Sequence, residues 1–301
     1  MGWWQRPLVV GASGQVGAEL CRELASGGAN EVIRSAREPR EGWLTLNLGA
    51  VRSPEDAAKQ LGLVCPDLIL CSGAMTFVDG CESRPEEAFR VNAHGPSALA
   101  AYAHSRGIPF VFFSSDYVFD GSTEHPGPYV EGDVTRPLNV YGRSKLEGER
   151  AVQRVHPEAL VIRTSWVYGP DAAGKNFISS LARQLRAGQT VRVPLDQVST
   201  PTLNGDLADV ALRLAAAKAR GVFHVTGPDV VSRFALAKAV AEGLSLPAEQ
   251  IEGVETASLG QTAARPLRSG LRSERMASLL PGVRLHTLQE GLCLSLQALA
   301  P

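Results

Sequence analysis

Short apolar runs alternate along most of the chain with longer stretches in which apolar and polar residues mix. An apolar run that stops at glycine or another turn residue is typical of a buried strand, and the mixed stretches are typical of helices with one apolar face. We therefore predict strands within 7–10, 31–37, 43–48, 67–71, 109–113, 159–165 and 221–226, and helices within 18–25, 85–101, 140–150 and 206–217.

Strands that alternate with helices form a parallel sheet with both faces covered. The predicted fold class is therefore α/β, a doubly wound parallel sheet of the Rossmann type, with ligands at the carboxyl ends of its strands. Beyond residue 171 we predict a helix over 176–186, a strand over 189–193, a loop over 195–202 and a helix over 230–243. The remaining tail is mixed in pattern and rich in arginine around 265–275.

Three glycines follow the first predicted strand, in the order Gly11-Ala-Ser-Gly14-Gln-Val-Gly17. Glycine lets the backbone approach a pyrophosphate closely, and the helix N-terminus offers it unpaired N–H groups. The spacing differs from the commoner G-x-G-x-x-G, but its place at the first strand–helix junction favours dinucleotide binding over a purely structural turn. The candidate cofactor contacts in this turn are Gly11, Ser13, Gly14, Gln15 and Val16.

In many NAD sites an acidic residue about 20 residues beyond the glycine turn binds the ribose 2′-hydroxyl. Here the corresponding segment ends in Arg34, Ser35 and Arg37. A guanidinium suits a 2′-phosphate, so we predict that the cofactor is NADP(H) and that Arg37 contacts it. Further candidate contacts lie where the next strands end: Asn47, Leu48, Ser72, Gly73 and Ala74.

Tyr141 and Lys145 lie four residues apart in a predicted helix, which puts both side chains on one face, about 5–6 Å apart at their Cβ atoms. An ammonium near a phenol lowers the pKa of the phenol, so the tyrosine becomes a better proton donor. Ser115 ends a predicted strand upstream and can hydrogen-bond a substrate carbonyl while Tyr141 protonates it. We predict Ser115, Tyr141 and Lys145 as the catalytic residues. Asn92 is equally a backbone tether or an ordinary polar helix residue.

Composition and charge exclude several classes of function. A net charge of −1 provides no basic field for nucleic acid or an anionic membrane, and no apolar run is long enough to span a bilayer. The first ten residues lack the basic start of a secretory signal. The five cysteines contain no C-x-x-C pair and the six histidines are scattered, which favours free thiols in a reducing compartment over disulfides or a zinc site. We expect a cytoplasmic protein without a nucleic-acid or membrane partner.

Several sequence phrases together resemble the extended short-chain dehydrogenases/reductases, and more closely the dTDP-4-dehydrorhamnose reductase family. The phrases occur in the family's order: GASGQVG at 11–17, CSGAMTFVDGCE at 71–82, VNAHG at 91–95, SSDYVFDG at 114–121, YGRSKLEGE at 141–149, RTSWVYG at 163–169 and DQVSTPT at 196–202. The phrases DYVFDG and RTSWVYG discriminate far better than the glycine turn or a bare Y-x-x-x-K.

The resemblance implies NADPH-dependent reduction of the C4 ketone of a dTDP-linked 6-deoxy-4-keto sugar, which converts dTDP-4-dehydrorhamnose to dTDP-L-rhamnose. Tyr141 would protonate the developing alkoxide, Lys145 would lower the tyrosine pKa and hold the nicotinamide ribose, and Ser115 would orient the carbonyl. The family usually has threonine where this chain has Ser115. Implied substrate contacts are Thr76, Val78, Asp116 and Trp166, although plain core packing is an equally good interpretation of Trp166.

The same resemblance divides the chain into an NADP-binding Rossmann domain, 1–170 and 202–227, and a smaller substrate-binding domain, 171–201 and 228–301. It also implies a sugar-nucleotide substrate and a possible homodimer. Some family members bind magnesium through glutamates at a dimer contact; Glu19 matches one such position, but the others are not found, so we predict no required metal. Two positions depart from the family: Ser199 replaces a glycine, and Arg272 replaces an aspartate.

Two other functions compete with the reductase. A regulatory subunit resembling the β-subunit of methionine adenosyltransferase would share the fold and motifs and act by binding an enzyme, and Tyr141 and Lys145 fit it as well. A 4,6-dehydratase or epimerase ranks low, because dehydratases of this superfamily need an Asp-Glu pair after the catalytic hydroxyl. Here Asp116 is followed by Tyr117, which cannot serve as that acid/base.

Overall fold

A parallel sheet forms the centre of the larger lobe in the computed structural model, which describes residues 4–171, 174 and 176–297. Within these residues seven strands pair in the order β11-β6-β5-β4-β1-β2-β3, and all pairs are parallel. The predicted doubly wound α/β fold is thus confirmed. The strands are β1 (Pro7–Val10), β2 (Ile33–Ala36), β3 (Leu44–Thr45), β4 (Leu68–Cys71), β5 (Phe110–Ser115), β6 (Leu160–Thr164) and β11 (Gly221–His224).

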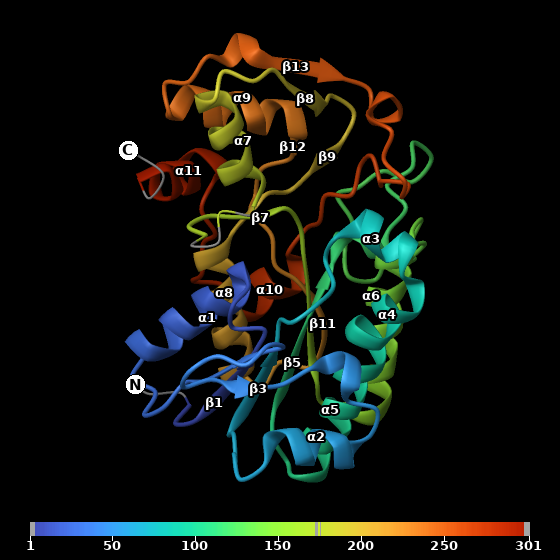
Figure 1. Cartoon of the computed structure of the whole chain (residues 1–301), viewed down its shortest axis with the longest axis vertical. Coiled ribbons are helices and arrows are strands. Elements are labelled where there is room, and N and C mark those ends of the chain that lie inside the picture. Colours follow the sequence, from blue (N-terminus) through green and yellow to red (C-terminus); the bar gives the residue numbers. More distant parts are fainter. Residues whose placement is uncertain (1–3, 172–173, 175, 298–301) are drawn as a thin grey trace.

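Helices cover both faces of this sheet (Figure 1). One face packs against α1 (Gln15–Ser26), α8 (Asn204–Ala216) and α10 (Glu274–Leu279), and the other against α2 (Pro54–Leu61), α5 (Gly95–Ser105) and α6 (Val140–Val155). Successive strand residues point to opposite faces. Leu68 and Leu70 of β4 therefore join the first apolar cluster, and Ile69 joins the second.

The helix predicted over 85–101 is interrupted. It consists of α4 (Pro85–Phe89), a π-turn over Arg90–His94 and α5, while the short α3 (Val78–Ser83) precedes it. A Cβ on Gly95 would lie 2.1 Å from the carbonyl oxygen of Leu48, so only glycine allows α5 to start this close to the Leu48–Ala50 turn. π-turns of this kind are frequent at functional sites.

The smaller lobe contains the elements that the sequence predicted least well (Figure 1). The predicted helix over 176–186 is present as α7 (Phe177–Arg186), but the predicted loop over 195–202 contains β9 (Val198–Ser199) and the helix predicted from residue 230 begins only at Arg233. These strands are too short to leave a hydrophobic period. The other elements outside the central sheet are β7 (Val167–Tyr168), β8 (Val191–Pro194), β10 (Thr202–Leu203), β12 (Val231–Ser232), α9 (Arg233–Gly243), β13 (Ile251–Val254) and α11 (Leu288–Gln297).

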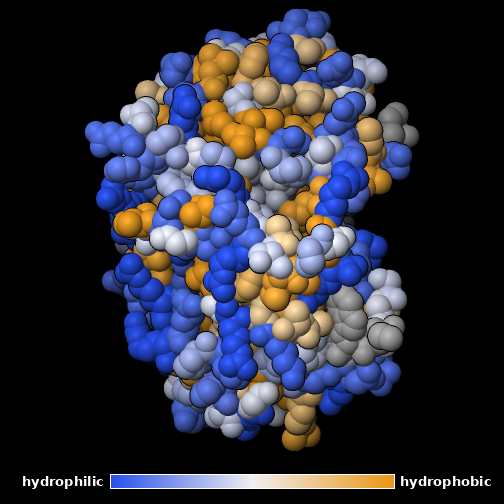
Figure 2. Space-filling model, turned by 180° about the vertical axis from the view of Figure 1, so that it is seen from behind, coloured by the Kyte–Doolittle hydropathy of each residue, from blue (hydrophilic) through white to orange (hydrophobic). Residues whose placement is uncertain are grey.

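A third apolar cluster, drawn mainly from α7, α9 and α11, forms the core of the smaller lobe. Figure 2 shows apolar residues exposed on this lobe among hydrophilic ones; Val230 and Leu294 are each 49% exposed. Among the described residues, none of the helices is both long and apolar enough to cross a membrane. Residues 1–3 of the N-terminal segment that we expected not to be a secretory signal lie outside the described residues, as do 172–173, 175 and 298–301, which fall in the predicted smaller domain. The proposed domain boundaries stay a prediction.

We predict that Gly148→Ala in α6 destabilises the protein by about 1–3 kcal/mol, as overpacking typically does. Alanine normally improves on glycine inside a helix. Here, however, a Cβ would lie 2.3 Å from the Asn92 carbonyl oxygen and 2.8 Å from Phe112 Cζ. Urea unfolding of both proteins measures the difference. Gly132→Ala is the matched control, because its Cβ would have no described atom within 4 Å; equal stability of Gly148→Ala and wild type would contradict this packing.

Candidate active site

The glycine turn lies at the point where the strand order reverses, between β1 and β4. Gly11 has a positive φ of 81°, and a Cβ at this position would lie 2.6 Å from Gly73 Cα. A Cβ on Gly17 would lie 2.2 Å from the Gly11 carbonyl oxygen. The turn is therefore compact for a steric reason, and it lies at the switch point beside which doubly wound folds bind dinucleotides.

The start of α1 suits an anionic group. Gly14 is the N-cap, and no described side chain caps this helix. The side-chain Nε2 atom of Gln15 is buried and has no hydrogen-bond partner among the described residues, which is costly for a donor unless a ligand supplies an acceptor. Ser13 is exposed, while Val16 packs against the first apolar cluster. The residues present thus fit the pyrophosphate of a dinucleotide.

Several predicted contacts gather beside this turn. Leu48 is buried, and its Cδ1 would lie 3.3 Å from a Cβ on Gly73. The side chain of Asn47 accepts a hydrogen bond from the Gly49 N–H (3.0 Å), so it shapes the turn that carries Leu48. The Ser72 hydroxyl donates to the Val10 carbonyl (2.9 Å) and fixes the end of β4, just before the partly buried Ala74.

The arginines after β2 are exposed, as a site for a 2′-phosphate requires. Arg37 pairs with Glu38 (3.0 Å), while Arg34 and Arg40 flank the ring of Trp43, with Cζ atoms 5.4 and 5.1 Å from its centroid. An exposed pair such as Arg37–Glu38 is weak and can exchange for a phosphate. Ser35 is different, because its buried hydroxyl donates to the Val9 carbonyl and faces away from any ligand.

Ser115 and Tyr141 meet because α6 starts against the turn that follows β5. The side chain of Asn139 caps α6 by accepting from the Gly142 N–H (2.8 Å), and a Cβ on Gly142 would lie 2.2 Å from the Tyr117 carbonyl oxygen. The Tyr117 and Tyr141 rings pack edge to face, with centroids 5.5 Å apart. Burial raises the pKa of Tyr141, while a hydrogen bond with the Ser115 hydroxyl acts in the opposite direction.

Lys145 is 2% exposed, and its Nζ donates to the carbonyl oxygen of Phe113 in β5 (2.6 Å). Burial lowers the pKa of Lys145 to about 8. The net pKa of Tyr141 is raised in this structure, with burial as the largest cause, and the lowering effect of Lys145 stays a prediction. Lys145 itself binds a backbone carbonyl, and desolvation outweighs any effect of its charge on the phenol.

Asp116 is buried and bound by serine hydroxyls on both of its oxygens. Its Oδ1 accepts from Ser115 (3.0 Å), and its Oδ2 accepts from Ser165 (2.8 Å), Ser199 (3.2 Å) and Ser269 (2.6 Å). Burial raises the pKa of Asp116, and the four hydroxyls act against that rise. The carboxylate therefore links Ser115 to three distant segments. Ser199, which stands where the family has a glycine, is one of these hydrogen-bond donors.

Two further buried groups support the site: Asn92, whose role the sequence left open, and Glu149, which the sequence analysis did not single out. Asn92 turns out to be a backbone tether: it binds both the N–H and the carbonyl of Met75 (2.8 and 3.1 Å) and donates to Ser144 (2.9 Å) in α6. Glu149 accepts a bidentate pair from Arg163 (2.9 and 2.7 Å) and thereby ties α6 to β6. The π-turn that carries Asn92 leaves no pattern in the sequence that distinguishes a tether from a surface residue.

The implied substrate residues differ in exposure. Thr76, two residues before α3, is exposed, and Val78, the first residue of α3, is partly buried. Trp166 follows Ser165 directly and has a positive φ of 40°, which is strained for a bulky residue and often marks a functional site. The guanidinium of Arg233 lies over its ring, with Cζ 3.5 Å from the centroid. Trp166 thus supports a charged group and is more than core filling.

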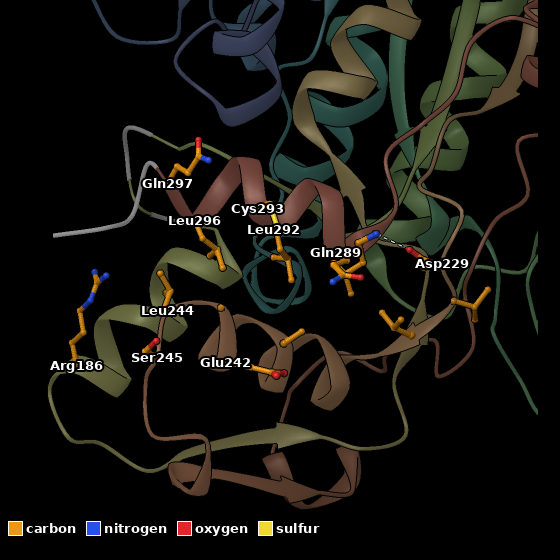
Figure 3. A pocket seen from close by; sticks show the side chains of 15 residues that line it. Arg186, Asp229, Glu242, Leu244, Ser245, Gln289, Leu292, Cys293, Leu296 and Gln297 are labelled. Atoms are coloured by element: carbon orange, nitrogen blue, oxygen red, sulfur yellow. Dashed lines mark hydrogen bonds between the residues drawn. The ribbon is translucent and has the colours of Figure 1, made fainter.

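A separate cavity of about 970 Å³ lies in the smaller lobe, between α7, α9 and α11 (Figure 3). None of the predicted site residues lines this cavity. The predicted catalytic residues lie elsewhere, at the carboxyl end of β5, where Ser115 ends the strand and Lys145 binds the Phe113 carbonyl.

The doubly wound sheet, the glycine turn at its switch point and the Ser115–Tyr141–Lys145 group define an extended short-chain dehydrogenase/reductase. A family model described as "RmlD substrate binding domain" matches residues 5–300. The chain belongs to this family, that of the dTDP-4-dehydrorhamnose reductases.

Proteins of related sequence match this chain over more than 90% of its length. It is 37% identical to the dTDP-4-dehydrorhamnose reductase of Mycobacterium tuberculosis (strain H37Rv), with 91% of this chain and 86% of that protein covered. It is 37% identical to the probable low-salt glycan biosynthesis reductase Agl14 of Haloferax volcanii, with 95% of each covered. The solved dTDP-4-dehydrorhamnose reductase of Bacillus anthracis in complex with NADP superposes with a TM-score of 0.86 at 27% identity, covering 97% of this chain and 99% of that one.

We predict that Lys145 makes the stability of the protein depend on pH between 8 and 10.5. In this window the unfolded chain binds a proton that folded Lys145 has lost, so its contribution to the free energy of unfolding rises with pH, by about 3 kcal/mol in total. Urea unfolding of wild type and Lys145→Met across this range measures the effect. The cysteines and tyrosines also titrate here, but they do so in both proteins, so the difference between the two stability curves isolates the contribution of Lys145. Parallel stability curves for the two proteins would refute the lowered pKa.

Proposed function

We propose that the protein reduces the C4 ketone of dTDP-4-dehydrorhamnose with NADPH and releases dTDP-L-rhamnose. The observation that carries this proposal is the meeting of Ser115, Tyr141 and Lys145 at the same sheet edge as the glycine turn. Support comes from the family and from relatives that are named as this reductase. The solved relative in complex with NADP supports NADP(H) as the cofactor.

The glycine turn and α1 would hold the cofactor's pyrophosphate, with Gln15 Nε2 available as a donor and the exposed arginines after β2 facing the 2′-phosphate. When bound, NADPH supplies the hydride. Lys145 lies deep beside β5, where it can donate to a ribose hydroxyl while keeping its bond to Phe113. The proposed contacts of Ser72, Gly73 and Ala74 follow from their place at the end of β4.

Tyr141 is the proposed proton donor to the carbonyl oxygen of the substrate. Its raised pKa keeps the phenol protonated, as a donor must be before transfer. The Ser115 hydroxyl has one proton, and in this structure it donates a hydrogen bond with that proton to Asp116 Oδ1. When a carbonyl oxygen arrives, the hydroxyl can rotate to it, since three other serines still solvate Asp116. Ser115 then orients the carbonyl and stabilises the developing alkoxide.

Cytoplasmic location and a homodimer complete the proposal. All five cysteines are free thiols in the structure, which supports a reducing compartment. The homodimer rests on the family resemblance alone. Sedimentation of the purified protein distinguishes a dimer from a monomer.

We predict that Tyr141→Phe lowers kcat by about 10²–10⁴-fold, because it removes a general acid. The binding of NADPH should stay within a few-fold of wild type, since the ring and Lys145 remain. The assay follows NADPH absorbance with dTDP-4-dehydrorhamnose and a panel of other 4-keto sugar nucleotides, with NADH in parallel. Tyr102→Phe, the same change on α5, is the control.

Wild-type turnover by Tyr141→Phe would show that another group donates the proton. Absence of turnover with every 4-keto sugar nucleotide, in protein that still binds NADPH, would remove the reductase proposal altogether.

A further inference from the structure

Arg233, the first residue of α9, is a cation without an acidic partner. Its Cζ lies 3.5 Å from the centroid of the Trp166 ring and 4.8 Å from that of Phe177. Within residues 4–171, 174 and 176–297, no carboxylate forms an ion pair with this guanidinium, and the one hydrogen bond of Arg233 outside α9 is from its backbone N–H to the Gln197 carbonyl (2.8 Å). The two rings pack against the guanidinium, and none of its five N–H donors forms a hydrogen bond to another residue that the structure describes.

The backbone places Arg233 next to the catalytic centre. Strand β12 pairs with β9 so that Val231 is opposite Ser199, whose hydroxyl binds Asp116. Trp166 directly follows Ser165, whose hydroxyl binds the same carboxylate. The two segments that hold the stacked pair are therefore both anchored beside Ser115. Burial raises the pKa of Tyr117, whose ring packs on Tyr141, and the charge of Arg233 acts against that rise.

The electrostatics of this arrangement call for an anion. Burial lowers the pKa of Arg233 to about 10, while the charges of Tyr117 and Asp116 act against this, so Arg233 carries its charge at neutral pH in surroundings that disfavour charge. Two aromatic faces offset part of that cost. Asp116 is already bound by four hydroxyls. Arg265, the other guanidinium whose charge lowers the pKa of Tyr117, is paired with Asp79 (2.8 Å).

We propose that Arg233, held flat on Trp166 and Phe177, binds the diphosphate of the nucleoside diphosphate sugar and so selects this substrate class. A planar guanidinium matches two phosphate oxygens at once. The inference rests on the proposed function, because it takes the substrate to be a sugar nucleotide. The cofactor's phosphates have other places, at the glycine turn and beside the exposed arginines after β2. Arg233 is therefore assigned to the substrate and not to NADPH.

Titration calorimetry on the full chain, saturated with NADPH, tests this proposal with dTDP as the charged probe and thymidine as the uncharged one. Arg233→Gln should weaken dTDP binding by about 10- to 100-fold, as expected for losing hydrogen bonds to a charged group. Thymidine and NADPH binding should change less than about twofold, because neither uses this charge. In turnover, KM for the sugar nucleotide should rise while kcat stays within a few-fold.

Two variants serve as controls. Arg192→Gln removes an exposed arginine of β8 from the same lobe and should bind dTDP like wild type. Arg233→Lys keeps the charge but loses the planar fork, so it should bind dTDP with intermediate strength. A lysine ammonium also forms a cation–π contact with aromatic rings, so Arg233→Lys should fold. If Arg233→Gln does not fold, the affinity of Arg233→Lys for dTDP still tests the proposal.

Unchanged dTDP affinity in Arg233→Gln would overturn the inference, and so would an equal loss of thymidine binding, which would indicate a merely structural role. A wild-type protein that binds none of dTDP, UDP and GDP would overturn it too. Arg233-dependent binding of UDP or GDP without reduction of a dTDP-linked sugar would keep the diphosphate site and reject the proposed substrate. The two proposals therefore fail separately.

Discussion

A single buried carboxylate, that of Asp116, organises the centre of this protein. Burying a charge is expensive unless hydrogen bonds replace its hydration. Here the serine hydroxyls of β5, of the residue after β6, of β9 and of the C-terminal segment do so, at 2.6 to 3.2 Å. Because these segments come from both lobes, the requirement to satisfy one charge fixes how the lobes meet.

The chemistry of the site follows from the same constraint. Ser115 is oriented by Asp116 on one side and faces Tyr141 on the other. Trp166 and Arg233 are held beside them by Ser165 and by the strand that pairs with Ser199. The hydroxyl proposed to orient the carbonyl, the phenol proposed to give a proton and the cation proposed to bind a diphosphate are thus parts of one connected structure. Asn92 and Glu149 add rigidity by tying α6 to the Met75 loop and to β6.

The sequence predicts the sheet and the glycine turn well, because strand burial and glycine spacing are local properties. Gly11 and Gly73 end neighbouring strands, so their approach follows once the fold class is known. The bonds to Asp116 cannot be read in this way, since they join residues 49, 83 and 153 positions apart. The raised pKa of Tyr141 could not be predicted either, because its largest cause is burial, and helix spacing says nothing of burial or of the Phe113 carbonyl that Lys145 binds. The short strands β9 and β12 likewise form because they pair with each other, although they are far apart in the sequence.

The most direct test is a double-mutant cycle between Asp116 and Ser269, read as free energies of unfolding in urea. Asp116→Ala, Ser269→Ala and the double variant are compared with wild type. If one carboxylate joins the lobes, the two changes should couple by about 1–2 kcal/mol, because Ser269→Ala costs little once Asp116 is gone. Additive effects, within about 0.5 kcal/mol, would mean that the lobes are held together by other contacts and would contradict this account.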